Sequence, residues 1–176
     1  MSCDILPTDI PGPHYQGDVR DVLDDGWDLM IAHPPCTYLS NAGARFLYPK
    51  GRLNRDRLKL GMEGRAFFMT LWNADIPMIA IENPTPSKIF NLPRYTQVIQ
   101  PYQFGHPVQK RTCLWLKGLS PLRPTRIVKG ATSTKYSPWF NKGGKDRQKN
   151  RAKTFDGIAK AMASQWGVLQ PERITT

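Results

Sequence analysis

Residues 27–36 read WDLMIAHPPC, a short apolar run that ends in two prolines and a cysteine. The length of the run and its apolar residues predict a buried strand, and the prolines stop it. In open α/β sheets, reactive groups lie just past the carboxyl ends of the strands. Cys36 is therefore a candidate nucleophile. The alternative is a buried and inert cysteine, which is the more usual state of this residue type.

A second run of the same form, IPMIAIEN, covers residues 76–83 and ends before Pro84. Glu82 lies at the end of this expected strand and is a candidate acid. The alternative is an ordinary surface carboxylate. Between the two runs, the apolar pattern predicts a helix over about 55–73. Strand, helix and strand form a βαβ unit with parallel strands, so that Cys36 and Glu82 meet at one end of the sheet.

The chain has 176 residues, enough for one ordinary domain and too few for two. We therefore expect a single α/β domain over residues 1–176. Residues 1–17 are too rich in proline for regular structure beyond their first residues. RTCLWLK, residues 111–117, predicts a further strand, and residues 155–166 predict a final helix.

The formal net charge of +11 indicates an anionic partner, most simply nucleic acid. Basic residues gather in a segment over 126–153, where Asp146 is the one acidic residue. This basic segment can neutralise DNA phosphates, and aromatic residues within it can stack on a base. The alternative is a solvated loop. The residues expected to contact DNA are Lys142, Lys145, Arg147, Lys149 and Arg151.

The sequence holds no apolar stretch long enough to span a membrane and no signal-peptide pattern, so we expect a soluble, cytoplasmic protein. Its cysteines are Cys3, Cys36 and Cys113. An odd number without CxxC spacing argues against a disulfide framework and against a zinc site. We expect three reduced thiols and no metal.

These residues suggest chemistry on a pyrimidine ring. A thiolate can add to the electron-poor carbon-6 if an acid protonates the ring nitrogen as the adduct forms. The addition makes carbon-5 nucleophilic. Cys36 can supply the thiolate and Glu82 the acid, while an arginine holds the exocyclic oxygen of the ring through charge-assisted hydrogen bonds.

The sequence resembles the DNA cytosine carbon-5 methyltransferases, especially the short phage-type cytosine methylases. Pro35-Cys36 matches the nucleophile motif of that family, and Glu82-Asn83 matches its Glu-Asn motif. Residues 104–111, FGHPVQKR, are similar to a later family segment that precedes a strand. The resemblance implies that Gln109 orients the catalytic loop and that Arg111 grips the cytosine oxygen. Val108 and Cys113 depart from the family pattern.

The same resemblance implies S-adenosylmethionine as cofactor. Asp4 would hold its ribose hydroxyls, Asp18 would meet its adenine amino group, and Pro35 would lie beside it. The implied fold is a Rossmann-like methyltransferase domain with a mostly parallel sheet. A glycine-rich loop is expected upstream of Asp4, so the chain resembles an N-terminally truncated member of the family.

In the family the first strand lies beside the strand that ends here at Cys36. Residues 29–32 should then present an unpaired edge, and exposed apolar edges pair or aggregate. We expect this edge to be covered by residues 3–11 folding back, by a second copy in a homodimer, by another partner, or by residues upstream of Met1.

Other functions stay open. A non-catalytic DNA-binding or phage counter-defence protein could be built on a methyltransferase remnant. A pyrimidine carbon-5 hydroxymethylating enzyme would use the same thiol chemistry without the glycine loop. Amino-methyltransferases have an aromatic residue in place of Cys36 and no use for Glu82. A zinc deaminase is excluded, because His33 and Cys36 lack the required neighbours.

Overall fold

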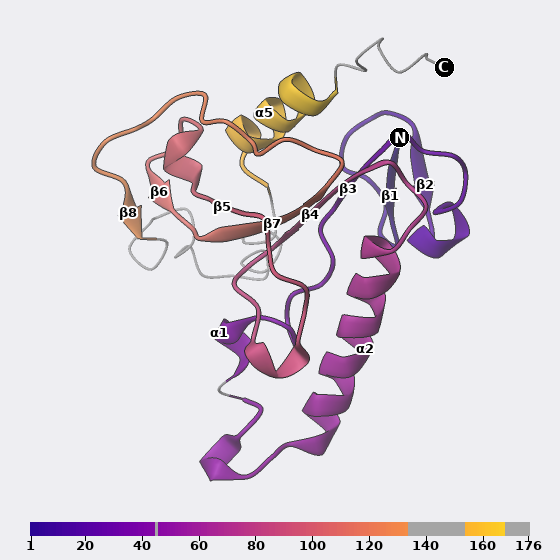
Figure 1. The fold of residues 1–176 in the computed structure, drawn as a ribbon, viewed down its shortest axis with the longest axis vertical. Helices are drawn as coiled ribbons and strands as arrows, with labels where there is room; N and C mark the ends of the chain where they lie inside the picture. Colours follow the sequence, from indigo (N-terminus) through magenta and orange to yellow (C-terminus); the bar gives the residue numbers. More distant parts are fainter. Residues whose placement is uncertain (45, 134–153, 168–176) are drawn as a thin grey trace.

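A four-stranded sheet in the order β3-β4-β7-β5 forms the centre of the computed structural model, which describes residues 1–44, 46–133 and 154–167 (Figure 1). Its strands are β3 (Leu29–Ala32), β4 (Met78–Asn83), β7 (Thr112–Lys117) and β5 (Gln97–Ile99). The residues expected to contact DNA, from Lys142 to Arg151, lie outside the described residues, and the role of the basic segment therefore stays a prediction.

The βαβ unit is confirmed. Strands β3 and β4 are parallel, with Ala32 opposite Ile81, and helix α2 (Arg55–Trp72) connects them. Strand β7, however, is antiparallel to both β4 and β5. The central sheet is therefore mixed: β3, β4 and β5 run in one direction, and β7 runs against them. Residues 100–111, which connect β5 to β7, contain the 3-10 turn η4 (Pro101–Gln103) and the short β6 (Val108–Gln109).

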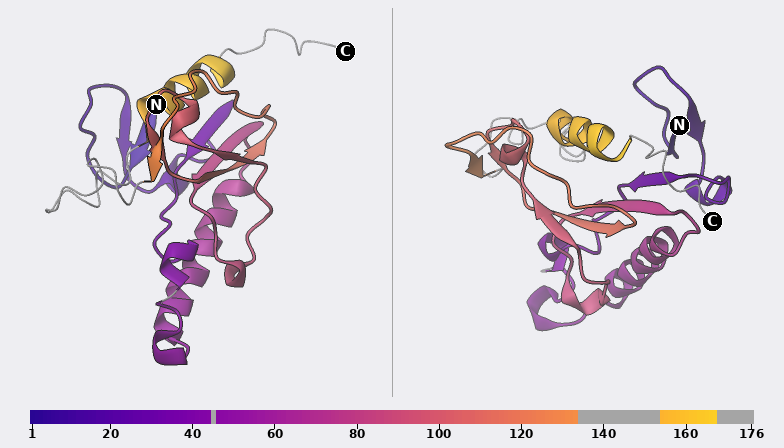
Figure 2. Two further views of the ribbon diagram at one scale, coloured as in Figure 1. Left: turned by 90° about the vertical axis from the view of Figure 1, so that its left-hand side faces the viewer. Right: turned by 45° about the horizontal axis from the view of Figure 1, so that its top comes forward.

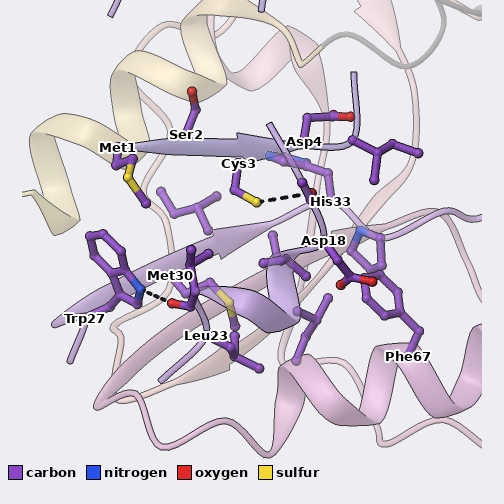
Figure 3. Close-up of a pocket in the computed structure, with 18 of the residues that line it drawn as sticks. Met1, Ser2, Cys3, Asp4, Asp18, Leu23, Trp27, Met30, His33 and Phe67 are labelled. Carbon is purple, nitrogen blue, oxygen red and sulfur yellow. Dashed lines mark hydrogen bonds between the residues drawn. The ribbon is translucent and has the colours of Figure 1, made fainter. Parts of the chain in front are cut away.

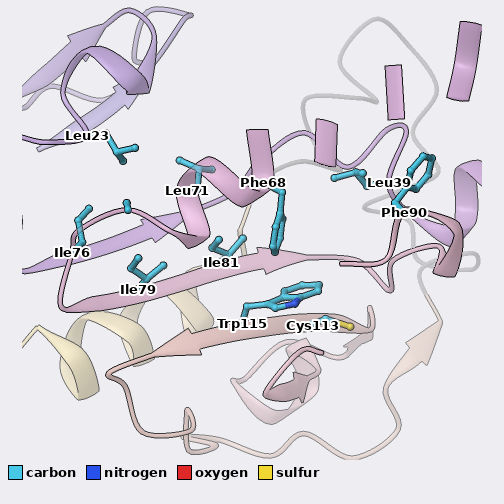
Figure 4. Close-up of a cluster of buried hydrophobic side chains, with 11 residues drawn as sticks. Leu23, Leu39, Phe68, Leu71, Ile76, Ile79, Ile81, Phe90, Cys113 and Trp115 are labelled. Atoms are coloured by element: carbon cyan, nitrogen blue, oxygen red, sulfur yellow. The ribbon is translucent and has the colours of Figure 1, made fainter. Parts of the chain in front are cut away.

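Helices cover both faces of this sheet (Figure 2). On one face, Phe68 and Leu71 of α2 pack against Ile79, Ile81 and Trp115 (Figure 4). On the other face, helix α5 (Asp156–Trp166) packs Ile158, Met162 and Trp166 against Ala80, Leu114 and Leu116. Adjacent residues of β4 and β7 alternate between the two cores because side chains alternate along a strand. The expected helices over 55–73 and 155–166 are thus present and hold the strands in place.

Smaller elements surround the sheet. Beyond β5 lies a parallel pair made of β6 and β8 (Thr132–Ser133). Short helical turns fill the loops that follow β3 and β4: α1 (Asn41–Ala44), η2 (Pro49–Gly51) and η3 (Lys88–Phe90). None of the helices that the structure describes has the length and apolar character needed to cross a bilayer.

The N-terminal segment forms its own two-stranded parallel sheet, β1 (Ser2–Asp4) with β2 (His14–Gln16), followed by the turn η1 (Val19–Asp21). Strand β1 pairs with β2 and not with β3, so this segment does not cover the edge by strand pairing. Within the described residues β3 pairs with β4 alone. Ile31 on that edge keeps 38% of its surface exposed.

Candidate active site

His33 and Glu82 lie next to each other at the carboxyl ends of β3 and β4. Because Ala32 is opposite Ile81, the next residue on each chain extends the register by one position. The His33 Nδ1 atom is 3.0 Å from Glu82 Oε2. Glu82 is therefore placed by the sheet itself, and its carboxylate has a partner from the neighbouring strand.

The loop that holds Cys36 is tied to the loop that follows Glu82. Asn83 donates from Nδ2 to the Pro34 carbonyl at 3.4 Å, and the Ser87 amide donates to the Leu39 carbonyl at 2.7 Å. The Cys36 carbonyl accepts hydrogen bonds from the amides of Leu39 and Ser40, which turns the chain sharply there. Cys36 is half-buried and Glu82 is partly buried. The structure thus brings these two loops together, as the βαβ interpretation expected.

Arg111 reaches the same end of the sheet from β7. Its Nε donates to Thr85 Oγ1 at 3.1 Å, and its Nη2 donates to the Tyr95 hydroxyl at 3.1 Å. Thr85 belongs to the loop directly after Glu82, and its carbonyl accepts the Asn41 amide at 2.9 Å. The guanidinium is therefore fixed at the junction of the two loops.

Gln109 lies elsewhere. It belongs to β6, it is exposed, and its side-chain amide donates to the Ala131 carbonyl at 3.1 Å. Its predicted role in orienting the loop of Cys36 stays a prediction. Cys113 is fully buried in the core. Burial is the main cause that raises the pKa of its thiol.

A cavity of about 610 Å³ opens beside the β3 edge, within the size range of small-molecule sites. Asp4, Asp18 and Pro35, the three residues expected to contact the cofactor, all line it, and so does His33. In Figure 3 the acidic residues and His33 lie toward one end of the cavity, with Trp27 toward the other. The apolar wall comes from η1, β3 and α2.

The two aspartates of the cavity are held by local hydrogen bonds. Asp18 caps η1 and accepts hydrogen bonds from the side chain and the amide of Arg20, which lower its pKa to about 2. Asp4 accepts the Leu6 amide at 2.9 Å. Cys3 donates to the Gly17 carbonyl, and burial together with the neighbouring carboxylates raises its pKa. The cavity therefore offers charged acceptors beside an apolar wall.

These residues fit the nucleoside half of S-adenosylmethionine. Carboxylates can accept hydrogen bonds from ribose hydroxyls and from an adenine amino group, and an apolar wall can cover the base. Among the described residues that line the cavity, none is a lysine or arginine that would pair with the carboxylate of the methionine half. Nor do the described residues contain a cluster of histidine, cysteine and acidic side chains suited to a metal ion.

Three residues of the site were not predicted from the sequence: His33, Thr85 and Tyr95. His33 carried a signal, since it directly follows the β3 run and the register of a parallel pair would have set it beside Glu82. No sequence pattern indicated a role for Tyr95, because its approach to Arg111 depends on the packing of the loop between β4 and β5.

No protein-family model matches the sequence, and comparison with curated proteins and with solved structures found no similar chain.

Proposed function

We propose that this chain acts as a DNA cytosine-5 methyltransferase through a covalent adduct on Cys36. One observation carries the proposal: the loop of Cys36 follows β3, Glu82 lies at the end of the adjacent parallel strand β4, and the next residue, Asn83, donates to the Pro34 carbonyl. Arg111 joins the same junction through Thr85. A nucleophile, an acid and a cation at one sheet end are the groups that addition to a pyrimidine needs.

In the proposed reaction, the Cys36 thiolate forms a bond to carbon-6 of the cytosine. The electron pair of the carbon-5–carbon-6 double bond shifts into the ring as Glu82 delivers a proton to the ring nitrogen. Arg111 holds the exocyclic oxygen and stabilises the charge that develops there. After substitution at carbon-5, a water molecule takes the carbon-5 proton, the electron pair of that bond expels the Cys36 thiolate, and the proton on the ring nitrogen returns to Glu82.

The proposed cofactor, S-adenosylmethionine, supplies an electrophilic methyl group when bound. Asp4 and Asp18 would hold its nucleoside half in the cavity, and Pro35 would lie at the boundary with the reacting base. Because Pro35 precedes Cys36 directly, the cavity and the nucleophile share one short segment.

The proposal is tested with duplex DNA that carries 5-fluorocytosine, in the presence of S-adenosylmethionine. Fluorine cannot leave as a proton does, so the adduct should survive denaturation and appear as a band of higher mass. Cys36→Ser should abolish this band and leave DNA affinity nearly unchanged, whereas Cys113→Ser should keep it. A band that persists in the Cys36→Ser variant would show that another thiol reacts.

A second candidate is a non-catalytic DNA-binding protein, favoured by the net charge of +11 and by the absence of a described basic residue in the cavity. Calorimetric titration with S-adenosylmethionine separates the two candidates, because the second expects DNA binding without cofactor binding. Under either candidate, changing Lys142, Lys145, Arg147 and Lys149 to alanine should flatten the log-log salt dependence of DNA binding by about two to four units.

A further inference from the structure

We infer that His33 is a positioning residue that shares one proton with Glu82 and keeps that acid protonated for attack on the pyrimidine. The inference rests on the proposed function and deepens it. Its geometric basis is the 3.0 Å contact between His33 Nδ1 and Glu82 Oε2, which joins the ends of two adjacent strands.

The pair is partly shielded and is connected to the cavity. The Glu82 side chain keeps 18% of its surface exposed and the His33 side chain 40%. His33 uses Nδ1 for Glu82, and no hydrogen bond joins its Nε2 to a residue that the structure describes. Because the His33 side chain lines the cavity, its second nitrogen can exchange protons there.

A lone glutamate is poorly suited to the acid role at neutral pH, since its carboxyl group titrates near pH 4.3 in water. Histidine titrates near pH 6.5 in water, closer to the pH of the cell. A carboxylic acid beside a neutral imidazole and a carboxylate beside an imidazolium hold the same shared proton. The pair therefore keeps a proton available at a pH where an isolated carboxylate would have lost it.

The proton count balances in each step. Before addition, one proton lies between Oε2 and Nδ1, and the pair is neutral. As Cys36 forms its bond to carbon-6, this proton passes through Glu82 to the ring nitrogen, which leaves a carboxylate beside an imidazole. When the adduct collapses and the thiolate leaves, the proton on the ring nitrogen returns to the pair.

The titratable groups around His33 come from several elements. Glu82 faces it from β4, and Asp4 and Asp18 line the same cavity from β1 and from the start of η1. Cys3 and the Met1 amine also line this cavity, while α2 contributes only apolar side chains. Cys36, three residues further along, is the remaining titratable neighbour on its own segment.

The test compares His33→Asn with the wild-type chain. Asparagine keeps a hydrogen-bond donor at the Nδ1 position but cannot carry the shared proton. The rate of adduct formation on 5-fluorocytosine DNA is measured from about pH 5 to about pH 7.5. We expect the variant to be slower than the wild type by a factor that grows from several-fold near pH 5 to far more than about tenfold near pH 7.5. Cys36 contributes equally to both chains, so the ratio isolates the proton on Glu82.

Two controls separate this role from a structural one. His14→Asn, at a histidine in β2, should leave the pH profile unchanged, and the rate of Cys36 alkylation should be the same in His33→Asn and wild type. A constant ratio of rates across the pH range would overturn the relay and leave the proposed function standing. A wild-type chain that forms no adduct would overturn both.

A measurement that does not depend on activity tests the shared proton directly, even if the His33→Asn variant fails to fold. In the wild-type chain with nitrogen-15 histidine, NMR should detect a hydrogen-bonded Nδ1 proton of His33. Glu82→Gln should shift or remove this resonance without changing the resonances of His14 and His106. An identical resonance in Glu82→Gln would show that the two side chains share no proton.

Discussion

The Arg111 guanidinium donates a hydrogen bond of 3.1 Å to the hydroxyl of Tyr95 and lies 6.0 Å from the centre of its ring. A flexible cation at the candidate site is thus held by an aromatic residue from a different segment. Tyr95 is itself fixed by an edge contact with the buried Trp115 at 5.9 Å. The core therefore sets the direction of an exposed side chain.

Tyr95→Phe should slow adduct formation on 5-fluorocytosine DNA by about three- to tenfold, because a hydrogen bond to a charged donor is lost at an exposed site. The phenylalanine ring keeps its contact with Trp115, so the melting temperature should stay nearly constant. Single-turnover trapping rates and a thermal melt measure the two effects. An unchanged rate would mean that Thr85 alone positions Arg111.

The three thiols should differ in their reactivity. Cys113 is fully buried, and burial raises the pKa of its thiol. Burial also raises the pKa of Cys3, and the negative charges of nearby carboxylates raise it further. Since the thiolate is the reactive form, both should be alkylated slowly. In the native protein, iodoacetamide should modify Cys36 first, as read by peptide mass spectrometry over time. Faster labelling of Cys113 would contradict the packing of β7.

Asp18 should stay ionised in acid. Hydrogen bonds from Arg20 lower its pKa to about 2, from an unfolded value near 3.9. Its contribution to stability is therefore fully present above about pH 4 and is lost as the pH falls through about 2. Carbon-13 NMR of the carboxyl group can follow this titration. In Arg20→Gln the midpoint should rise toward the ordinary value, and an unchanged midpoint would assign the shift to the backbone hydrogen bond.

Two glycines of α2 give a matched pair of substitutions. At Gly61 a methyl group would overlap the Phe90 ring, whereas at Gly64 the nearest atom would be Leu39 Cγ at 3.4 Å, an ordinary contact. Gly61→Ala should lower the free energy of unfolding by about 1–3 kcal/mol through overpacking. Gly64→Ala should raise it by about 0.5–1 kcal/mol, because alanine loses less entropy in a helix. Urea unfolding measures both, and equal effects would refute the close approach of η3 to α2.

The sequence by itself determined the strands that carry the candidate site. The apolar runs that end at Pro34 and at Pro84 predicted β3 and β4, and the helical pattern between them required a parallel pair. The order strand, helix, strand along the chain is enough to predict this pairing, since a βαβ unit has one favoured hand and its two strands end on the same side. The meeting of the Cys36 loop and Glu82 follows from it without further information.

Tertiary structure decided the partners of those residues. Tyr95 contacts Arg111, and β7 lies antiparallel between β4 and β5. Neither arrangement could be predicted from the sequence, because both depend on how a segment without a periodic pattern packs on Trp115. The pairing of β1 with β2, rather than with β3, was likewise outside the reach of the sequence pattern, because three-residue strands carry too little pattern to select a partner. The cavity between them and β3 exists only through that choice.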